Sequence, residues 1–339
     1  MPDANFPLLI GIIVLAVGFG FTNGLNDAAN AIATAIGTRA LSPRSAVTIA
    51  AVFNFAGAAT GLEVARTIGK GILIPEAVTL ITMISALASV IIWGLLATYR
   101  GLPVSITHGF VAGLAAAGIA AVGNDAVSWG VMGRVMSAVI TAPLLGFLGG
   151  FLIMVCFLWV LRRGAPNKIR SVFSKLQIPA AAFVAYAHGK NDGQMPVGVI
   201  TMALVTYYGD VSKWEHLSIT DPSMSWVIIL SALAISSGMA LGGRRVIKTV
   251  GMRMTVMTPV QGFTAQASAA VVIETASQLG IPVSTTHCVS SSIMGVGATK
   301  RVSAVRWGIA GNIVAAWILT FPICGLLGYF FSWVLHLIF

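Results

Sequence analysis

Residues 280–287 read GIPVSTTH and residues 101–108 read GLPVSITH, and this duplicated octapeptide organises the whole chain. Six of the eight positions are identical, and the two histidines, His108 and His287, lie 179 positions apart. Both copies place a helix-breaking proline before hydroxyl side chains, in a chain that is 57% hydrophobic. Both copies also continue to a glycine and then to a Trp-Gly pair. Chance is a poor explanation for such a run, so the sequence indicates an internal duplication.

A second repeated element precedes each octapeptide. Residues 24–27 read GLND and residues 189–192 read GKND. The order of the motifs is therefore the same twice over, first Asn-Asp and then the octapeptide. We predict two related halves, an N-terminal transmembrane repeat at 1–161 and a C-terminal transmembrane repeat at 178–339, joined by a basic linker at 162–177.

The composition indicates an integral membrane protein. Only 9% of the 339 residues are charged and the mean hydropathy is +0.92, whereas soluble domains carry about 25% charged residues. Long apolar runs occupy 6–22, 46–62, 77–98, 135–161, 225–241 and 307–335, and shorter ones occupy 109–122, 178–187, 195–208 and 256–275. None of these runs alternates as barrel strands do. We predict an all-α polytopic membrane protein with roughly ten transmembrane helices and two re-entrant helical hairpins.

The positive charge is concentrated in clusters that indicate membrane orientation and not a nucleic-acid partner. The net charge is +10. One cluster lies in the linker and another lies at 244–253, and the positive-inside rule puts both at the cytoplasmic face. The acidic loop 209–222 and the N-terminal tail, which carries Asp3, are expected outside. We therefore predict a multi-pass protein of the cell membrane with a cytoplasmic linker and an outside N-terminus.

The start of the chain and its cysteines carry no processing or metal signal. The first apolar run follows no positively charged segment, so we expect a retained helix and not a removed signal peptide. Cys156, Cys288 and Cys324 lie far apart in apolar surroundings, without disulfide or metal spacing. We expect no cofactor and no resident metal.

The two Asn-Asp elements predict an ion site. Asp27 and Asp192 each lie between apolar segments, and a carboxylate at membrane depth marks an ion or substrate pathway by default. With Asn26 and Asn191 they offer oxygen ligands for a hard cation, or a carboxylate that carries a proton. The alternative is that each aspartate caps a helix end near the interface. The repetition of the pair favours the functional interpretation.

The octapeptides predict an anion site. Proline suits the first turn of a helix, where free N–H groups and a positive dipole end attract oxyanions. We therefore expect the hydroxyl groups at these helix starts to bind an anion, namely those of Ser105, Thr107, Ser284, Thr285 and Thr286. The alternative is a packed helix start that uses serine and threonine only as caps.

Four further side chains leave their roles open. His108 and His287 could carry protons, donate to a substrate or be structural. Lys190 could pair with Asp192, attract an anion or extend to the interface. Glu274 lies in an apolar run and has no counterpart in the first half, where Leu95 aligns with it.

Inverted halves with interrupted helices are the pattern of secondary transporters, although a channel could share it. At this point NGLNDAANAIAT (23–34) and AHGKNDGQMPVG (187–198) resemble the paired signatures of the inorganic phosphate transporter (PiT) family, and both octapeptides resemble its hairpin motifs. The resemblance covers both halves. It implies an importer of inorganic phosphate by cation symport through alternating access. It also implies phosphate at the octapeptide hydroxyls and at Asp27 and Asp192, and the coupling cation or proton at the two Asn-Asp elements.

Departures from the family pattern bear on the coupling ion. Sodium-coupled members often have glutamate where Asn54 and Gln266 stand here. The second signature reads NDGQM, with Gln194, and Met195 aligns with Asn30. Together with Lys190, these features are similar to the bacterial low-affinity phosphate permease branch, which implies proton coupling before sodium and a metal–phosphate complex as a form of the cargo. A homodimer would be consistent with the resemblance.

The same motifs raise three alternative functions. Some relatives carry sulfate or another oxyanion. A site that accepts a hydrogen bond favours phosphate, since phosphate keeps a proton near neutral pH. An anion channel would pass the anion without coupling. An intramembrane hydrolase is disfavoured, because nucleophilic serines usually lie in a G-x-S-x-G turn and no G-x-S occurs in this sequence.

Overall fold

The computed structural model describes residues 5–338, and every regular element in that range is helical, which confirms the all-α prediction. Within these described residues, four helices are long and apolar enough to cross a membrane, and the number rises to six if each of two bent helix pairs is one span. Sequence hydropathy predicted roughly ten crossings. The four are α1 (Phe6–Gly37), α4 (Leu80–Arg100), α6 (Trp129–Val160) and α13 (Trp307–Ile338).

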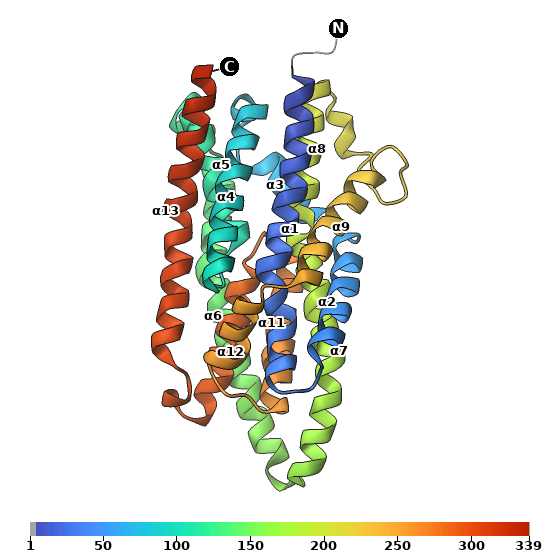
Figure 1. The fold of residues 1–339 in the computed structure, drawn as a ribbon, viewed down its shortest axis with the longest axis vertical. Coiled ribbons are helices and arrows are strands. Elements are labelled where there is room, and N and C mark those ends of the chain that lie inside the picture. Colours follow the sequence, from blue (N-terminus) through green and yellow to red (C-terminus); the bar gives the residue numbers. More distant parts are fainter. Residues whose placement is uncertain (1–4, 339) are drawn as a thin grey trace.

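The two bent pairs bend near the middle of the bundle (Figure 1). One consists of α2 (Pro43–Ala58) and α3 (Glu63–Gly71), which meet at 69°. The other joins α9 (Ser225–Leu241) to α10 (Arg244–Lys248) and the π-helical turn after it, at 60°. Two more helices, α7 (Pro166–Asp192) and α8 (Gln194–Tyr208), follow each other with only Gly193 between them.

Each octapeptide forms the tip of a helical hairpin, as predicted. The first hairpin joins α4 to α5 (Ile106–Val122), and the second joins α11 (Pro259–Gln278) to α12 (Thr285–Lys300). Gly101 (φ 72°) and Gly280 (φ 66°) take the left-handed conformation that ends a helix, and proline then prevents continuation. Ser105 and Ser284 cap the returning helices by accepting from the backbone N–H three residues on.

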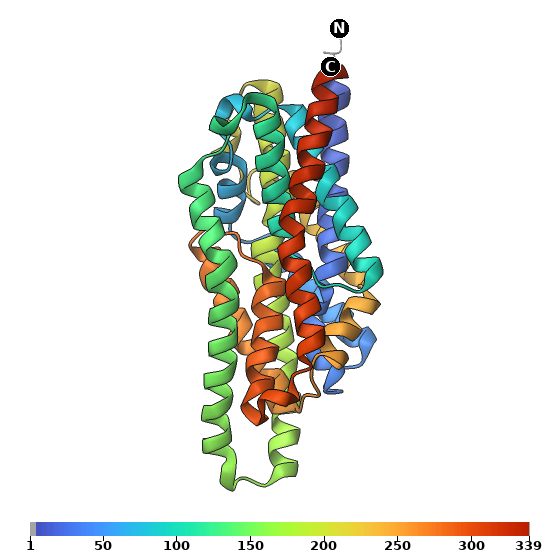
Figure 2. The same cartoon turned by 90° about the vertical axis from the view of Figure 1, so that its left-hand side faces the viewer.

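The two hairpins occupy opposite halves of the bundle and meet at their tips (Figures 1 and 2). The first lies in the half that holds both chain ends, and the second lies toward the other end. Their tips touch directly: Thr286 Oγ1 lies 3.1 Å from Val104 O, and the ring centres of His108 and His287 lie 5.0 Å apart. The duplicated segments are therefore neighbours in space.

Helices of the two predicted halves interlock. The helix α5 packs against α13, α12 against α6, α1 against α9 and α2 against α7. The crossings of α1 with α9 and of α7 with α2 require glycine, because a Cβ on Gly24 would lie 1.9 Å from Ile235 O and one on Gly189 would lie 2.0 Å from Asn54 O. The close crossings hold α1 and α7, the two helices with Asn-Asp elements, in the middle of the molecule.

The hydrophobic core is split in two by a polar layer. The first part of α1, including Leu9 and Phe19, belongs to a core around the first hairpin. From Ala28 onward α1 belongs to a second core around α11 and α12. Asp27 lies at the boundary between these cores, where α1 passes both hairpin tips.

Within the predicted linker, residues 166–177 form the first turns of α7. Pro166 suits a first helical position, and the lysines and arginines after it favour helix. The ends of α6 and α7 extend beyond the other helices, at the end of the bundle opposite the chain termini (Figure 1). The 209–222 loop lies toward the termini. Asp3, on which the expectation for the N-terminal tail depended, lies outside the described residues.

Candidate functional site

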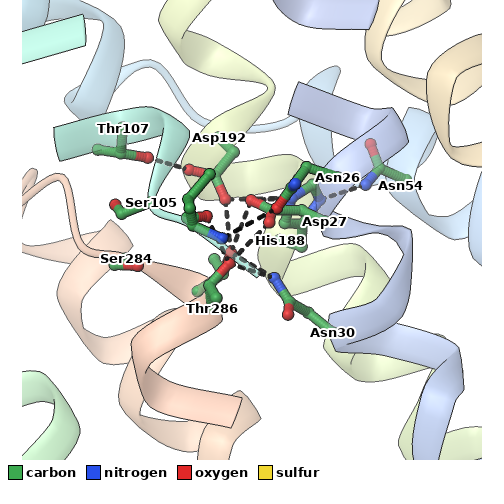
Figure 3. A network of polar contacts seen from close by, with 12 residues as sticks. Asn26, Asp27, Asn30, Asn54, Ser105, Thr107, His188, Asp192, Ser284 and Thr286 are labelled. Carbon is green, nitrogen blue, oxygen red and sulfur yellow. Dashed lines mark hydrogen bonds and ion pairs between the residues drawn. The ribbon is translucent and has the colours of Figure 1, made fainter. Parts of the chain in front are cut away.

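Two buried carboxylates and one imidazole meet at the polar layer (Figure 3). Asp27 comes from α1, and His188 and Asp192 come from α7. His188 Nε2 lies 3.1 Å from Asp192 Oδ2 and 3.6 Å from Asp27 Oδ2. All three side chains are buried, and their ligand atoms lie within 4.8 Å of one another. The set can hold a proton or a cation between its oxygens and ring nitrogen.

Sequence reasoning did not identify His188. A signal was present, because His188 lies four residues before Asp192 and residues at that spacing share a helix face. Asn54 on α2 orients the ring, since its amide nitrogen lies 2.5 Å from Nδ1. Donation from that amide leaves the ring hydrogen on Nε2, facing both carboxylates. Asn54 therefore acts on the cluster through His188.

Threonines from both hairpin tips donate to the carboxylates. Thr107 Oγ1 donates to Asp192 Oδ1 at 2.6 Å. Thr285 Oγ1 donates to Asp192 Oδ2 at 2.9 Å, and Thr286 Oγ1 to Asp27 Oδ1 at 2.7 Å. These threonines occupy the first turns of α5 and α12, so the positive ends of both helix dipoles face the cluster. The structure thus brings predicted anion donors and predicted cation ligands into direct contact.

Asn30 belongs to the same network. Its amide nitrogen donates to the hydroxyls of Thr285 at 3.2 Å and Thr286 at 3.0 Å. Its side-chain oxygen is buried and has no partner among the described residues. Asn30 therefore holds the second hairpin tip against α1 and leaves one acceptor free beside the cluster.

The asparagines that precede the aspartates contact the hairpins. Asn26 accepts from Val104 N at 3.2 Å and donates to Thr98 Oγ1 at 2.8 Å. Asn191 donates to Ser277 Oγ at 3.0 Å. These contacts fix the positions of the hairpins relative to α1 and α7. The structure does not bring the side chain of either asparagine into hydrogen-bonding contact with the carboxylates.

Ser105 and Ser284 also lie beside the cluster (Figure 3). Their oxygens accept from the N–H groups of His108 and His287, each at 3.1 Å. Within residues 5–338, neither serine hydroxyl donates its hydrogen to an acceptor. Each serine therefore caps its helix and still has a hydroxyl hydrogen to donate. It can act both as a helix cap and as an anion donor, the two interpretations that the sequence left open.

The remaining candidates lie outside the carboxylate cluster. Gln194 accepts from Val64 N at 3.0 Å and so caps the start of α3. Gln266 donates to Ala31 O at 3.1 Å. His108 and His287 contact each other, and His287 also lies against Trp317, with the ring centres 4.0 Å apart.

Lys190 and Glu274, whose roles were open, are partners. Lys190 Nζ lies 2.5 Å from Glu274 Oε1, with the two side chains 14% and 16% exposed. The pair joins α7 to α11 two residues from Asp192. Its opposite charges offset each other, so the pair adds no net charge beside the Asp27–His188–Asp192 cluster.

Comparisons with known proteins place the chain in a family. The profile of the Phosphate transporter family matches residues 23–168 and, again, residues 162–328. A "Probable low-affinity inorganic phosphate transporter" of Rhizobium meliloti (strain 1021) is 40% identical over 323 residues, covering 95% of each chain. One of the same name from Bacillus subtilis (strain 168) is 39% identical over 339 residues, covering 99% of this chain and 100% of its own.

A solved structure agrees with these relatives. It is titled "The sodium-dependent phosphate transporter" and matches with a TM-score of 0.87 at 27% identity, over 98% of this chain and 100% of the other. The chain belongs to the phosphate transporter family, as the duplicated motifs predicted. Its relatives of about 40% identity are bacterial and named low-affinity, in line with the predicted branch. Membership of a transporter family also decides against the hydrolase alternative.

Proposed function

We propose that this protein imports inorganic phosphate in symport with a cation, by alternating access at the polar layer between the hairpin tips. One observation carries the proposal: threonines from both tips converge on two buried carboxylates. Helix starts with hydroxyl donors suit a tetrahedral oxyanion. Two carboxylates would repel that anion unless a cation or protons neutralise them first, so binding of the two solutes is coupled.

The threonine hydroxyls provide a physical link between the two solutes. Each hydroxyl has one hydrogen to donate, and in the structure that hydrogen goes to a carboxylate. A proton or cation at Asp27 or Asp192 satisfies the carboxylate and releases the hydroxyl toward phosphate. Loss of the cation returns the hydroxyl to the carboxylate and weakens phosphate binding by the same factor.

The proton is the coupling ion that we favour, with sodium as the alternative. His188 contacts both carboxylates, and an imidazole between carboxylates is suited to carry a proton. Asn54 contacts this ring through its amide nitrogen. It offers no carboxylate to a sodium ion, whereas sodium-coupled members of the family often have glutamate at this position. The solved relative is titled sodium-dependent, which keeps sodium in the test. The carboxylate–imidazole set would also accept the metal of a metal–phosphate complex as cargo.

We also propose that the halves are inverted repeats, with six crossings and two re-entrant hairpins. The crossings are α1, α2–α3, α6, α7–α8, α9–α10 and α13. This set leaves out α4, which is an arm of the first hairpin, and adds α7–α8, which follow each other across Gly193. Three crossings in each half would reverse the second half, and the hairpins enter from opposite ends (Figure 1). The positive-inside rule then makes the α6–α7 end cytoplasmic and puts the N-terminus outside.

Uptake of labelled phosphate into proteoliposomes, under separate proton and sodium gradients, tests the proposal. We expect accumulation above the equilibrium level with an inward proton gradient. Sulfate should compete poorly, because it lacks the proton that a carboxylate can accept. Equal competition by sulfate would favour the general oxyanion permease. Entry that never exceeds the phosphate gradient would indicate the channel and overturn the symport proposal.

A further inference from the structure

We propose that a groove at the α6–α7 end of the bundle binds an anionic phospholipid. The groove has a volume of about 800 Å³ and lies between the end of α1, the ends of α6 and α7 and the segment before α11. It contains none of the residues of the carboxylate cluster. Its position coincides with the protruding ends of α6 and α7 (Figures 1 and 2).

The lining combines an apolar body with three arginines. Phe157, Leu158 and Val256 are among its apolar side chains, and Val256 is 78% exposed. A free anion would not cover exposed apolar surface of this kind, whereas an acyl chain would. The occupant must therefore offer hydrocarbon as well as negative charge.

The arginines supply positive charge that is not paired with a carboxylate of residues 5–338, although Arg162 lies over the ring of Trp159 at 4.9 Å. Arg39, Arg162 and Arg170 line the groove, and no aspartate or glutamate does. Among residues 5–338 none of the three forms an ion pair with a carboxylate. Guanidinium groups bind phosphate oxygens through paired hydrogen bonds, so they fit a phosphodiester headgroup.

The backbone conformation at Arg39 also supports the lipid proposal. Arg39 has φ 62°, the left-handed conformation at the end of α1 where glycine is the usual residue. An arginine in this conformation is more strained than glycine would be, and it adds a guanidinium group to the lining of the groove. A headgroup held here would lie where the apolar part of α1 ends, at the depth of lipid headgroups.

The test is lipid retention by the purified full-length protein in native mass spectrometry, with dioleoyl phosphatidylglycerol and dioleoyl phosphatidylcholine as probes. The groove variant is Arg39→Gly/Arg162→Ala/Arg170→Ala. Its control is Arg163→Ala/Lys168→Ala/Lys175→Ala, which loses the same charge from the same region outside the groove. We expect about tenfold weaker phosphatidylglycerol retention in the groove variant, since charge-assisted hydrogen bonds are lost, and unchanged retention in the control.

Two further variants separate binding from folding. Arg39→Gly alone removes a charge and relaxes the backbone, so it should weaken lipid retention without lowering the thermal unfolding midpoint. Val256→Trp fills the groove with all arginines present and should also reduce retention. The proposal is overturned if the groove and control variants retain phosphatidylglycerol equally, or if phosphatidylcholine is retained as well as phosphatidylglycerol. Displacement of the lipid by excess inorganic phosphate would overturn it too, and would assign the arginines to a free anion.

Discussion

The two hairpin–aspartate units share their scaffold and differ in their chemistry. Asn26 donates to Thr98 in the first unit, and Asn191 donates to Ser277 in the second. Thr98 and Ser277 lie 179 positions apart, the same offset as the octapeptides. This contact between an asparagine and the adjacent hairpin helix therefore occurs in both units.

The charged groups beside the aspartates are not duplicated. The second half has His188 and Lys190 where the first has Asn23 and Leu25. Asp192 also accepts from threonines of both hairpins, whereas the threonine contacts of Asp27, Thr286 at 2.7 Å and Thr285 at 3.5 Å, come from the second hairpin only. The two units therefore share a hairpin contact made by asparagine, whereas the histidine and the lysine occur beside Asp192 alone.

Replacing either aspartate by asparagine should have the largest effect. Asp27→Asn and Asp192→Asn each remove a charge that accepts hydrogen bonds worth about 1.5–3 kcal/mol each. We expect proton-driven phosphate accumulation to fall about 100-fold or more, because 1.4 kcal/mol is a tenfold change. Proteoliposome uptake measures this, with monodisperse gel filtration as the check on folding.

Asp210→Asn, in the exposed 209–222 loop, is the control and should transport normally. The comparison predicts that Asp192→Asn is the more damaging substitution, since Asp192 has the denser contacts. Accumulation like that of the unmodified protein in either site variant would remove that aspartate from the mechanism.

His188→Gln tests whether the residue unique to the second half carries the proton. It keeps a polar side chain and removes the ring that joins Asp27 to Asp192. We expect accumulation under a proton gradient to fall about tenfold, the usual effect of one charge-assisted hydrogen bond. Exchange of labelled for unlabelled phosphate at equal pH should persist, because exchange needs no net proton movement.

His216→Gln is the matched control, because His216 is an exposed histidine of the 209–222 loop. Asn54→Ala should reproduce part of the effect by releasing the ring. Equal losses of exchange and accumulation in His188→Gln would indicate a structural role only.

The duplicated features could be predicted from sequence, and the unique ones could not. The octapeptides specify a glycine turn, a proline and a serine cap within one short segment, so both hairpin tips follow from local chemistry. Asp27 and Asp192 can be proposed as a pair because the Asn-Asp element occurs twice in the sequence. His188 has no histidine at the equivalent position, Asn23, and its meaning depends on contacts that only the fold creates.

The number of membrane crossings is also hard to predict from the sequence alone. Hydropathy divides an apolar segment wherever polar residues intervene, so 178–187 and 195–208 appear in the sequence as two separate runs. In the structure these runs belong to α7 and α8, which follow each other across the polar signature. Buried polar residues thus lower the local hydropathy even where the chain continues from one helix directly into the next.

Substitutions in the Lys190–Glu274 ion pair should have a moderate effect on phosphate uptake. Lys190→Glu or Glu274→Lys alone places like charges together beside the site and should reduce uptake roughly fivefold, since a partly exposed pair contributes up to about 1 kcal/mol. The double exchange Lys190→Glu/Glu274→Lys should restore most of the uptake. Failure of the double variant, with a normal elution profile, would mean that the lysine acts on the anion itself.

The cap serines should show the smallest effect, and they test how symmetric the anion site is. Ser105→Ala and Ser284→Ala each remove a cap worth about 1 kcal/mol and one free hydroxyl donor. We expect the KM for phosphate to rise about threefold in each, since a net hydrogen bond contributes about 0.5–1.5 kcal/mol. Ser105→Thr and Ser284→Thr keep both the cap and the donor, and should behave like the unmodified protein. Unequal changes in KM would show that phosphate lies closer to one hairpin. An unchanged KM with a lower unfolding midpoint in both alanine variants would reduce the serines to caps and leave anion binding to Thr107, Thr285 and Thr286.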